Sequence, residues 1–190
     1  QPCARRRSDS PAVAQLWART GVSPSDLNAV AVAIGPGSYT GLRVGLALAK
    51  GIALGQKLPL VGVPTLDIVA AAVNRLDTDL VVLAQAGRSR LWAGQYSWSD
   101  KRRWEPEGDP VLTQWDDLLG RVQVPVAFAG EIDAAAAKLI RRVNRSAHIV
   151  APAGSVRRAA VLAEIGFARW KKQQVTDANA LAPTYLREPG

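Results

Sequence analysis

Short apolar runs alternate along the chain with segments whose apolar residues recur every three or four positions. The runs predict buried strands at 27–34, 60–63 and 80–84, and a further one in "VPVAFAGE" at 124–131. The periodic segments predict helices at 11–20, 40–55, 65–73, 132–143 and 156–171. Residues 90–98, "RLWAGQYSW", alternate like a half-exposed strand. This alternation of strands and helices predicts a layered α/β fold.

The remaining segments are short or polar. They predict a polar turn at 101–109, a short strand at 111–113, a helical turn at 115–119, a short strand at 148–150 and an irregular tail. Thr65 is the expected cap of its helix. The polar segment 74–78 is the expected hinge between two lobes, 1–75 and 76–190, with a tail that can return to the first lobe.

Glycine is unusually frequent in the helix predicted at 40–55. Gly41 and Gly45 lie four residues apart, and Ala47, Gly51 and Gly55 form a second series of the same spacing. Residues four apart share one face of a helix. Each helical glycine costs about 0.5–1 kcal/mol relative to alanine. Close approach of another backbone, which bare positions permit, would offset this cost.

The other positions of this helix are almost all apolar, so it must be covered on more than one side. Its own sheet covers one side. The second cover is either another helix of this chain or a partner protein, and the sequence leaves both open.

The glycine-rich loop before this helix could hold a phosphate, because backbone N–H groups and a helix N-terminus would face the anion. The candidate residues are Gly35, Gly37 and Ser38. The Walker pattern is absent, the glycine spacing differs from the dinucleotide fingerprint by one residue, and Pro36 removes one donor. Helix capping by Ser38 or Thr40 is the favoured interpretation.

The formal net charge of +8 favours a polyanion such as RNA, although the basic residues are scattered in small groups. Arg88 and Arg90 are weak candidates for tRNA contact, and Trp92, Trp98, Trp104 and Trp115 are expected to pack in the core. Cys3 is the only cysteine, and no apolar run is long enough to cross a membrane, so a cytoplasmic location is expected.

Residues for independent catalysis are scarce. His148 is the only histidine, so with Cys3 it cannot complete a zinc site, nor does it lie near Ser38 or Thr40 in sequence to activate a nucleophile. Glu131 and Asp133 suit the start of a helix. The sequence therefore predicts no catalytic residue, no metal and no cofactor.

Residues 30–71 carry a family resemblance: a strand, the motif Gly-Pro-Gly-Ser-aromatic-Thr-Gly-Leu-Arg, an apolar helix ending in Lys-Gly, and a Pro-Leu-Val-Gly-Val strand before Thr-Leu. Together with the tail "PTYLREP", this segment resembles the bacterial TsaB (YeaZ) family. The resemblance implies an actin-like ATPase (ribonuclease H-like) fold of two lobes. It implies a first lobe that here lacks its N-terminal strands, because no Leu-Ala-Ile-Asp-Thr-Ser strand precedes Pro11.

The resemblance also implies a role as a non-catalytic subunit in tRNA threonylcarbamoyladenosine formation at adenosine 37. The implied partners are TsaD as a heterodimer, TsaE in a larger complex, a second copy through the same surface, and tRNA indirectly. The expected interface residues are Leu16, Gly41, Arg43, Gly45, Leu48 and Ile52.

The sequence departs from the family pattern at two further points. No histidine stands in "RRRSDS", and the family's Asp-Ala-Arg is replaced by Gln85-Ala86-Gly87 followed by Arg88. Both departures weaken the expectation of a bound nucleotide or metal. The alternative function is an ATP-binding or ATP-hydrolysing protein that uses the Gly35–Gly41 loop.

Overall fold

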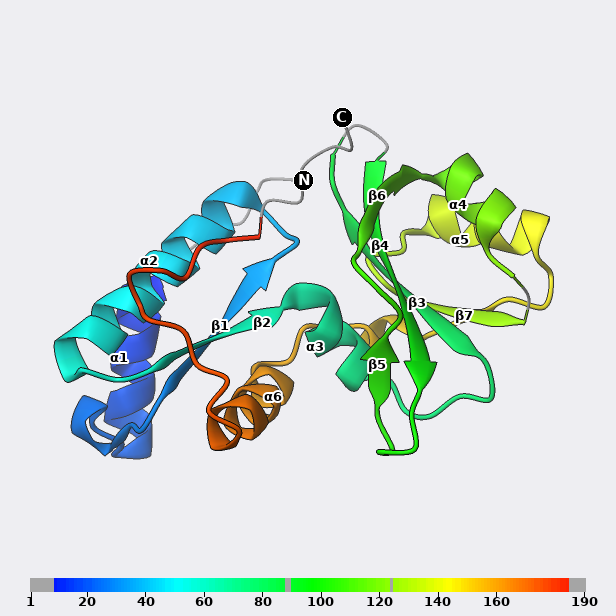
Figure 1. The fold of residues 1–190 in the computed structure, drawn as a ribbon. Helices are drawn as coiled ribbons and strands as arrows, with labels where there is room; N and C mark the ends of the chain where they lie inside the picture. The colour runs from blue at the N-terminus through cyan, green and yellow to red at the C-terminus, as the bar shows by residue number, and fades with distance from the viewer. Residues whose placement is uncertain (1–8, 88–89, 124, 185–190) are drawn as a thin grey trace. The chain divides into compact units, whose positions relative to one another are not determined.

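The computed structural model describes residues 9–87, 90–123 and 125–184. The chain divides into two compact units (Figure 1). The first comprises the described residues up to 34 together with 38–63 and 163–183, and the second comprises 35–37 and 64–162. This division differs from the predicted boundary at residue 75. Residues 64–75 join the second unit, and residues 163–183 return to the first.

The first unit is built from helices on a small sheet. Its elements are α1 (Asp9–Thr20), η1 (Pro24–Asp26), β1 (Val30–Gly35), α2 (Tyr39–Gln56), β2 (Leu60–Pro64) and the later part of α6 (Ala159–Lys171). Within the described residues, β1 and β2 form a two-stranded sheet. The buried core of this unit consists of Val32, Leu46, Ala49, Ala53, Leu60, Ala178 and Leu181. The last two belong to the tail, so the tail completes this core.

Both helices α1 and α2 end at a residue in the left-handed conformation. Gly21 follows α1 with φ +70°, and its N–H donates to the carbonyl oxygen of Trp17. Lys57 ends α2 in the left-handed conformation, with φ 54°, and its N–H donates to the carbonyl oxygens of Ala53 and Leu54. The helix α1 packs on α2.

The second unit is a mixed sheet between helices. Its elements are α3 (Thr65–Ala71), β3 (Asp79–Gln85), β4 (Arg90–Trp98), β5 (Trp104–Pro106), β6 (Val111–Gln114), α4 (Trp115–Arg121), β7 (Val126–Gly130), α5 (Ala134–Val143), β8 (His148–Ile149) and η2 (Pro152–Gly154). The sheet order is β5-β4-β3-β7-β8, and β6 also pairs with β4. The strand β4 runs antiparallel to β3, β5 and β6, whereas β3, β7 and β8 are parallel neighbours.

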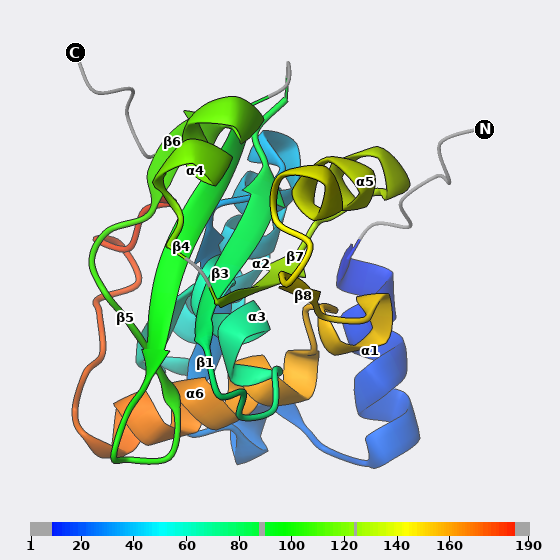
Figure 2. The ribbon, with the colours of Figure 1, turned by 90° about the vertical axis from the view of Figure 1, so that its right-hand side faces the viewer.

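Alternate residues of the central strand β3 fill two cores, one on each face of the sheet. Leu80, Val82 and Ala84 pack with Leu66 and Val69 of α3. Val81 and Leu83 pack on the other face, where the helical members of the core are Leu118 of α4 and Ile140 of α5. Figure 2 shows α4 and α5 at one end of the view, apart from α3. This two-sided burial explains the uninterrupted apolar run of β3.

Two polar contacts fix α3 and the segment after it to the sheet. The phenol of the buried Tyr96 donates to Oδ1 of Asp67 at 3.0 Å, and the indole N–H of Trp104 donates to the carbonyl oxygen of Val73 at 3.0 Å. Burial, followed by the neighbouring Asp67 carboxylate, raises the pKa of Tyr96 far above its ordinary value. The phenol therefore stays protonated and remains a donor.

Two local predictions were wrong. Residues 101–109 were expected to form only a polar turn, but they contain β5, which pairs with β4 through Trp98 and Trp104. Thr65 is not a cap: Pro64 occupies the N-cap position without a side-chain hydrogen bond, and Thr65 is buried as the first helical residue.

Replacement of Gly130 by alanine tests the close approach of β7 to β3. Gly130 has φ +103°, and a Cβ there would lie 2.1 Å from the carbonyl oxygen of Leu83. We expect Gly130→Ala to lower the free energy of unfolding by about 2–4 kcal/mol, measured by denaturant titration. Gly120→Ala is the control, because its Cβ meets nothing within 4 Å on α4. Equal stability of the two variants would contradict this account.

Candidate partner-docking surface

The outer side of α2 carries positions without side chains that nothing in the described chain covers. A Cβ built on Gly45, Gly51 or Gly55 meets no described atom within 4 Å. The glycines therefore do not serve close packing within the described residues. A partner protein as the second cover of α2 stays a prediction.

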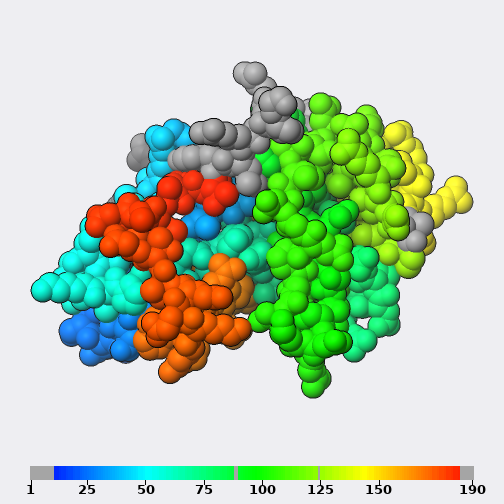
Figure 3. Space-filling view, viewed as in Figure 1, coloured from blue at the N-terminus to red at the C-terminus, as the bar shows by residue number. Residues whose placement is uncertain are grey.

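Large apolar side chains surround these glycines on the same two helices. Val44 and Leu54 of α2 are 47 % and 52 % exposed, and Leu16 of α1 is 57 % exposed. Ala47 is also exposed. Figure 3 shows the atoms of α2, drawn in cyan, at the surface of the first unit. We call the exposed apolar side of α1 and α2 the docking surface.

A cationic aromatic pair lies at the start of α2, next to this surface. Tyr39 is 55 % exposed, and the guanidinium of Arg43 stacks over its ring, 4.0 Å from the ring centroid. An aromatic ring and an arginine held together in this way are residue types enriched at protein interfaces.

The six predicted interface residues lie on α1 and α2, but they differ in solvent exposure. Leu16 and Arg43 are exposed, whereas Gly41, Gly45, Leu48 and Ile52 are half-buried along the side of α2 next to its sheet-facing residues. Tyr39, Val44 and Leu54 were missed. Their apolar character was visible in the sequence, but periodicity alone does not tell which apolar face of a helix is covered.

The loop before α2 is arranged as a helix start. The hydroxyl of Ser38 accepts from the N–H of Gly41 at 3.4 Å, and its carbonyl oxygen accepts from the N–H of Leu42 at 2.8 Å. Ser38 is thus the N-cap. Gly35 has φ +120°, a conformation that other residues rarely adopt. Gly35 is needed for the course of this loop, and the candidate phosphate ligand Ser38 already serves as the cap of the helix.

Acidic side chains occupy the carboxyl ends of β3 and β7 in the second unit. Glu131 accepts from the N–H of Gln85 at 2.7 Å and pairs with Arg157, and Asp133 caps α5 by accepting from the N–H of Ala136 at 2.7 Å. These carboxylates and Arg90 line a cavity of about 340 Å³. Arg90 and the Arg157 that pairs with Glu131 offset these two negative charges, so the described charges of the cavity do not decide for or against a phosphate.

The weaker candidates have structural places or fall outside the described residues. Arg90 is half-buried beside the cavity just mentioned, and its tRNA contact stays a prediction; Arg88 and Cys3 lie outside the described residues. His148 is exposed on β8, and no group of His, Cys, Asp and Glu suited to a metal occurs among the described residues. The four predicted core tryptophans pack as expected, with Trp98 and Trp104 in an edge-on contact at 5.2 Å.

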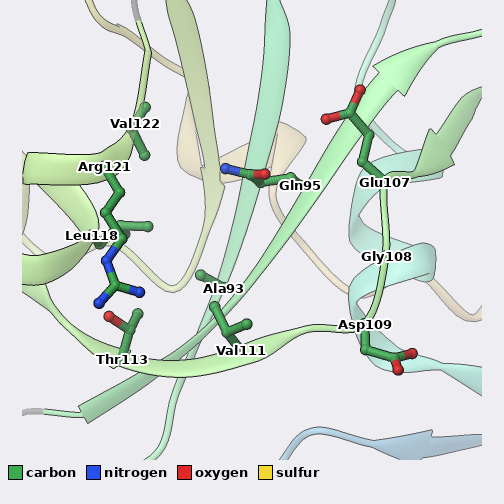
Figure 4. Close-up of a pocket in the computed structure, with 10 residues that line it drawn as sticks. All are labelled: Ala93, Gln95, Glu107, Gly108, Asp109, Val111, Thr113, Leu118, Arg121 and Val122. Atoms are coloured by element: carbon green, nitrogen blue, oxygen red, sulfur yellow. The ribbon is translucent and has the colours of Figure 1, made fainter.

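A shallow cavity of about 220 Å³ lies between β4, β6 and α4 of the second unit (Figure 4). Arg121 of α4 points toward Thr113, whereas the carboxylates of Glu107 and Asp109 do not point toward Arg121. The charged groups do not converge on one point, so the cavity has no evident ligand chemistry.

No helix among the described residues is long and apolar enough to cross a membrane.

Comparison with known proteins shows which protein family and which solved structures the chain resembles. The family described as "TsaD: tRNA N6-adenosine threonylcarbamoyltransferase" matches residues 6–190. In structure, the chain is similar to YeaZ from Pseudomonas aeruginosa, with a TM-score of 0.77 and 21 % identity, covering 98 % of this chain and 87 % of that one. The fold is therefore the α/β fold of the actin-like (ribonuclease H-like) class, as predicted.

Two curated relatives show the protein family of the chain. The chain is 30 % identical over 180 residues to the tRNA threonylcarbamoyladenosine biosynthesis protein TsaB of Bacillus subtilis (strain 168), covering 93 % of this chain and 77 % of that protein. It is 40 % identical over 115 residues to the TsaB of Escherichia coli (strain K12), covering 60 % of this chain and 50 % of that protein. The chain belongs to the TsaB (YeaZ) family.

Removal of the Ser38 hydroxyl tests its capping role. We expect Ser38→Ala to lower the free energy of unfolding by about 0.5–2 kcal/mol, because the N–H of Gly41 loses its acceptor. Thermal or denaturant unfolding measures the change. Thr40→Ala, in the exposed first turn of α2, is the control and is expected to change stability by less than about 0.5 kcal/mol. A larger loss of stability from Thr40→Ala than from Ser38→Ala would show that Ser38 is not the cap.

Proposed function

We propose that this chain is a non-catalytic subunit in the formation of threonylcarbamoyladenosine on tRNA. Membership of the TsaB family supports the process. The docking surface supports the mode of action, because its glycines Gly45, Gly51 and Gly55 have no packing partner within the described chain. That uncovered side of α2 is the observation on which the proposal rests.

In this proposal the partner is the TsaD transferase, which the chain holds in an active arrangement. A helix of the partner lies against the glycines, where its backbone can approach closely. Leu16, Val44 and Leu54 then lose their contact with water, which contributes about 25 cal/mol for each Å² of apolar area buried. Arg43 on Tyr39 supplies a polar contact at the edge.

The same surface can serve a second copy of the chain when TsaD is absent, since uncovered apolar helices associate readily. TsaE and tRNA enter the proposal only through the assembly with TsaD. The cytoplasm is the proposed compartment, because tRNA modification takes place there.

Gly45→Leu tests the docking surface. A Cβ at this position meets no described atom within 4 Å, and leucine is a better helix former than glycine, so we expect the isolated variant to gain about 0.5–1 kcal/mol of stability. The same leucine would hold a partner backbone away. Co-elution with TsaD in size-exclusion chromatography is therefore expected to be lost.

Ala168→Leu is the matched control, because Ala168 is exposed on α6, away from the docking surface. It is expected to keep full co-elution with TsaD. Unchanged co-elution of Gly45→Leu would defeat the proposed interface, whereas loss of co-elution in both variants would point to a general defect.

Calorimetry with ATP and Mg²⁺ tests the alternative function. We expect no binding in the micromolar range, because the Ser38 hydroxyl already caps α2 and Pro36 lacks the backbone N–H that a phosphate would use. Micromolar binding that Ser38→Ala abolishes would favour an ATP-binding protein over a docking subunit.

A further inference from the structure

Positive charges gather in one stretch of the second unit that contains no carboxylate side chain. Residues 134–162 include six lysine or arginine residues and no aspartate or glutamate. Two of the six have partners within the described chain: Arg157 pairs with Glu131, and Arg158 donates to the carbonyl oxygen of Ala153 at 2.8 Å. The other four lie on α5 or directly after it. They are Lys138, Arg141, Arg142 and Arg145.

These four residues are all exposed, and none of them has a hydrogen bond or an ion pair with another described residue. Lys138, Arg141 and Arg142 are three and four positions apart, so they share one side of the helix. The buried Ala136 and Ile140 occupy the opposite side. Figure 3 shows the yellow atoms of this part of the chain at the surface of the second unit. We call the four residues the cationic face of α5.

The needs of the helix itself explain only part of this face. Arg141 and Arg142 lie in the last turn of α5, where a positive charge suits the negative end of the helix dipole. Lys138 lies in the middle of α5 and Arg145 lies beyond its end, so the dipole does not account for either. Lys138 and Arg142 are also like charges four residues apart, which repel each other. Binding of an anionic partner would relieve this repulsion.

We propose that the cationic face of α5 binds the phosphate backbone of tRNA directly. Guanidinium groups donate two N–H groups to a phosphate at once, and the lysine ammonium adds a compact positive charge. Such contacts position a nucleic acid without reading its bases. The net charge of +8 attracts the polyanion over a longer range. Among polyanions, the choice of tRNA rests on the proposed function.

A membrane and an acidic protein fit the face less well. An amphipathic helix on a membrane buries its apolar side in lipid, but the apolar side of α5 already packs in the core of the sheet. Protein interfaces are centred on buried apolar or aromatic anchors. Among the described residues of α5, Val143 alone is a large apolar side chain with high exposure, 56 %. Phosphates need no such anchor.

Salt-dependent binding of an unmodified tRNA transcript tests the proposal. The fluorescence anisotropy of a labelled transcript is measured with the full chain between about 50 and 200 mM salt. Each phosphate contact that is lost lowers the slope of log K against log salt by about 0.7–0.9. Lys138→Gln combined with Arg142→Gln is therefore expected to lower the slope by about 1.4–1.8 and to weaken binding at least about tenfold at the lowest salt.

Lys171→Gln combined with Lys172→Gln is the matched control, because it removes the same charge from two exposed residues at the end of α6. It is expected to weaken binding less than about threefold. Glutamine forms helices nearly as well as lysine and arginine, so both double variants are expected to unfold at the temperature of the parent chain.

Two further measurements separate this proposal from the docking surface. The Lys138→Gln and Arg142→Gln variant is expected to keep its co-elution with TsaD, because α5 is not part of α1 or α2. Gly45→Leu is expected to keep tRNA binding. Loss of one property without the other therefore shows which of the two proposals has failed.

Three results would overturn the cationic face as a tRNA site. The first is failure of the transcript to bind at the lowest salt. The second is equal weakening by the two double variants, which would assign binding to the net charge alone. The third is binding to phosphatidylserine vesicles that depends on Lys138 and Arg142 and is tighter than binding to the transcript, which would assign the face to a membrane.

Discussion

The missing Cβ atoms on the outer side of α2 are the constraint on which the role of the chain depends. A helical glycine costs conformational entropy on folding and contributes no side-chain packing. A series of helical glycines is therefore expected where another segment packs closely on the bare backbone. Within the described residues nothing approaches Gly45, Gly51 or Gly55. The proposed compensation is an assembly with a partner, and membership of the TsaB family supports this proposal.

Gly130 in the second unit has the opposite role, because a side chain there would collide with the chain itself. Backbone atoms of Leu83 take the volume that a side chain at Gly130 would need, and both faces of β3 are buried. A sheet packed on both sides is rigid. Leu16, Val44 and Leu54 are exposed on α1 and α2 of the first unit, and these two helices form the surface proposed for a partner.

The sequence predicted the elements well wherever apolar periodicity extended over several turns or a whole strand. The helix expected at 40–55 is observed at Tyr39–Gln56. The sequence prediction failed at β5, which has three residues in a polar stretch and is stabilised by pairing with the neighbouring strand β4. The division into units places α3 with the second unit, because α3 packs on β3. At the docking surface, the glycine spacing was readable, but the exposure of Val44 and Leu54 required the fold.

The return of residues 163–183 to the first unit has a consequence for synthesis on the ribosome. The first unit cannot complete its core until Ala178 and Leu181 have left the exit tunnel, whereas all strands of the second unit have been made by then. Folding that follows the order of emergence would finish the later-starting unit first. The helices α1 and α2, which form the proposed docking surface, would then be the last part of a nascent chain to gain a complete core.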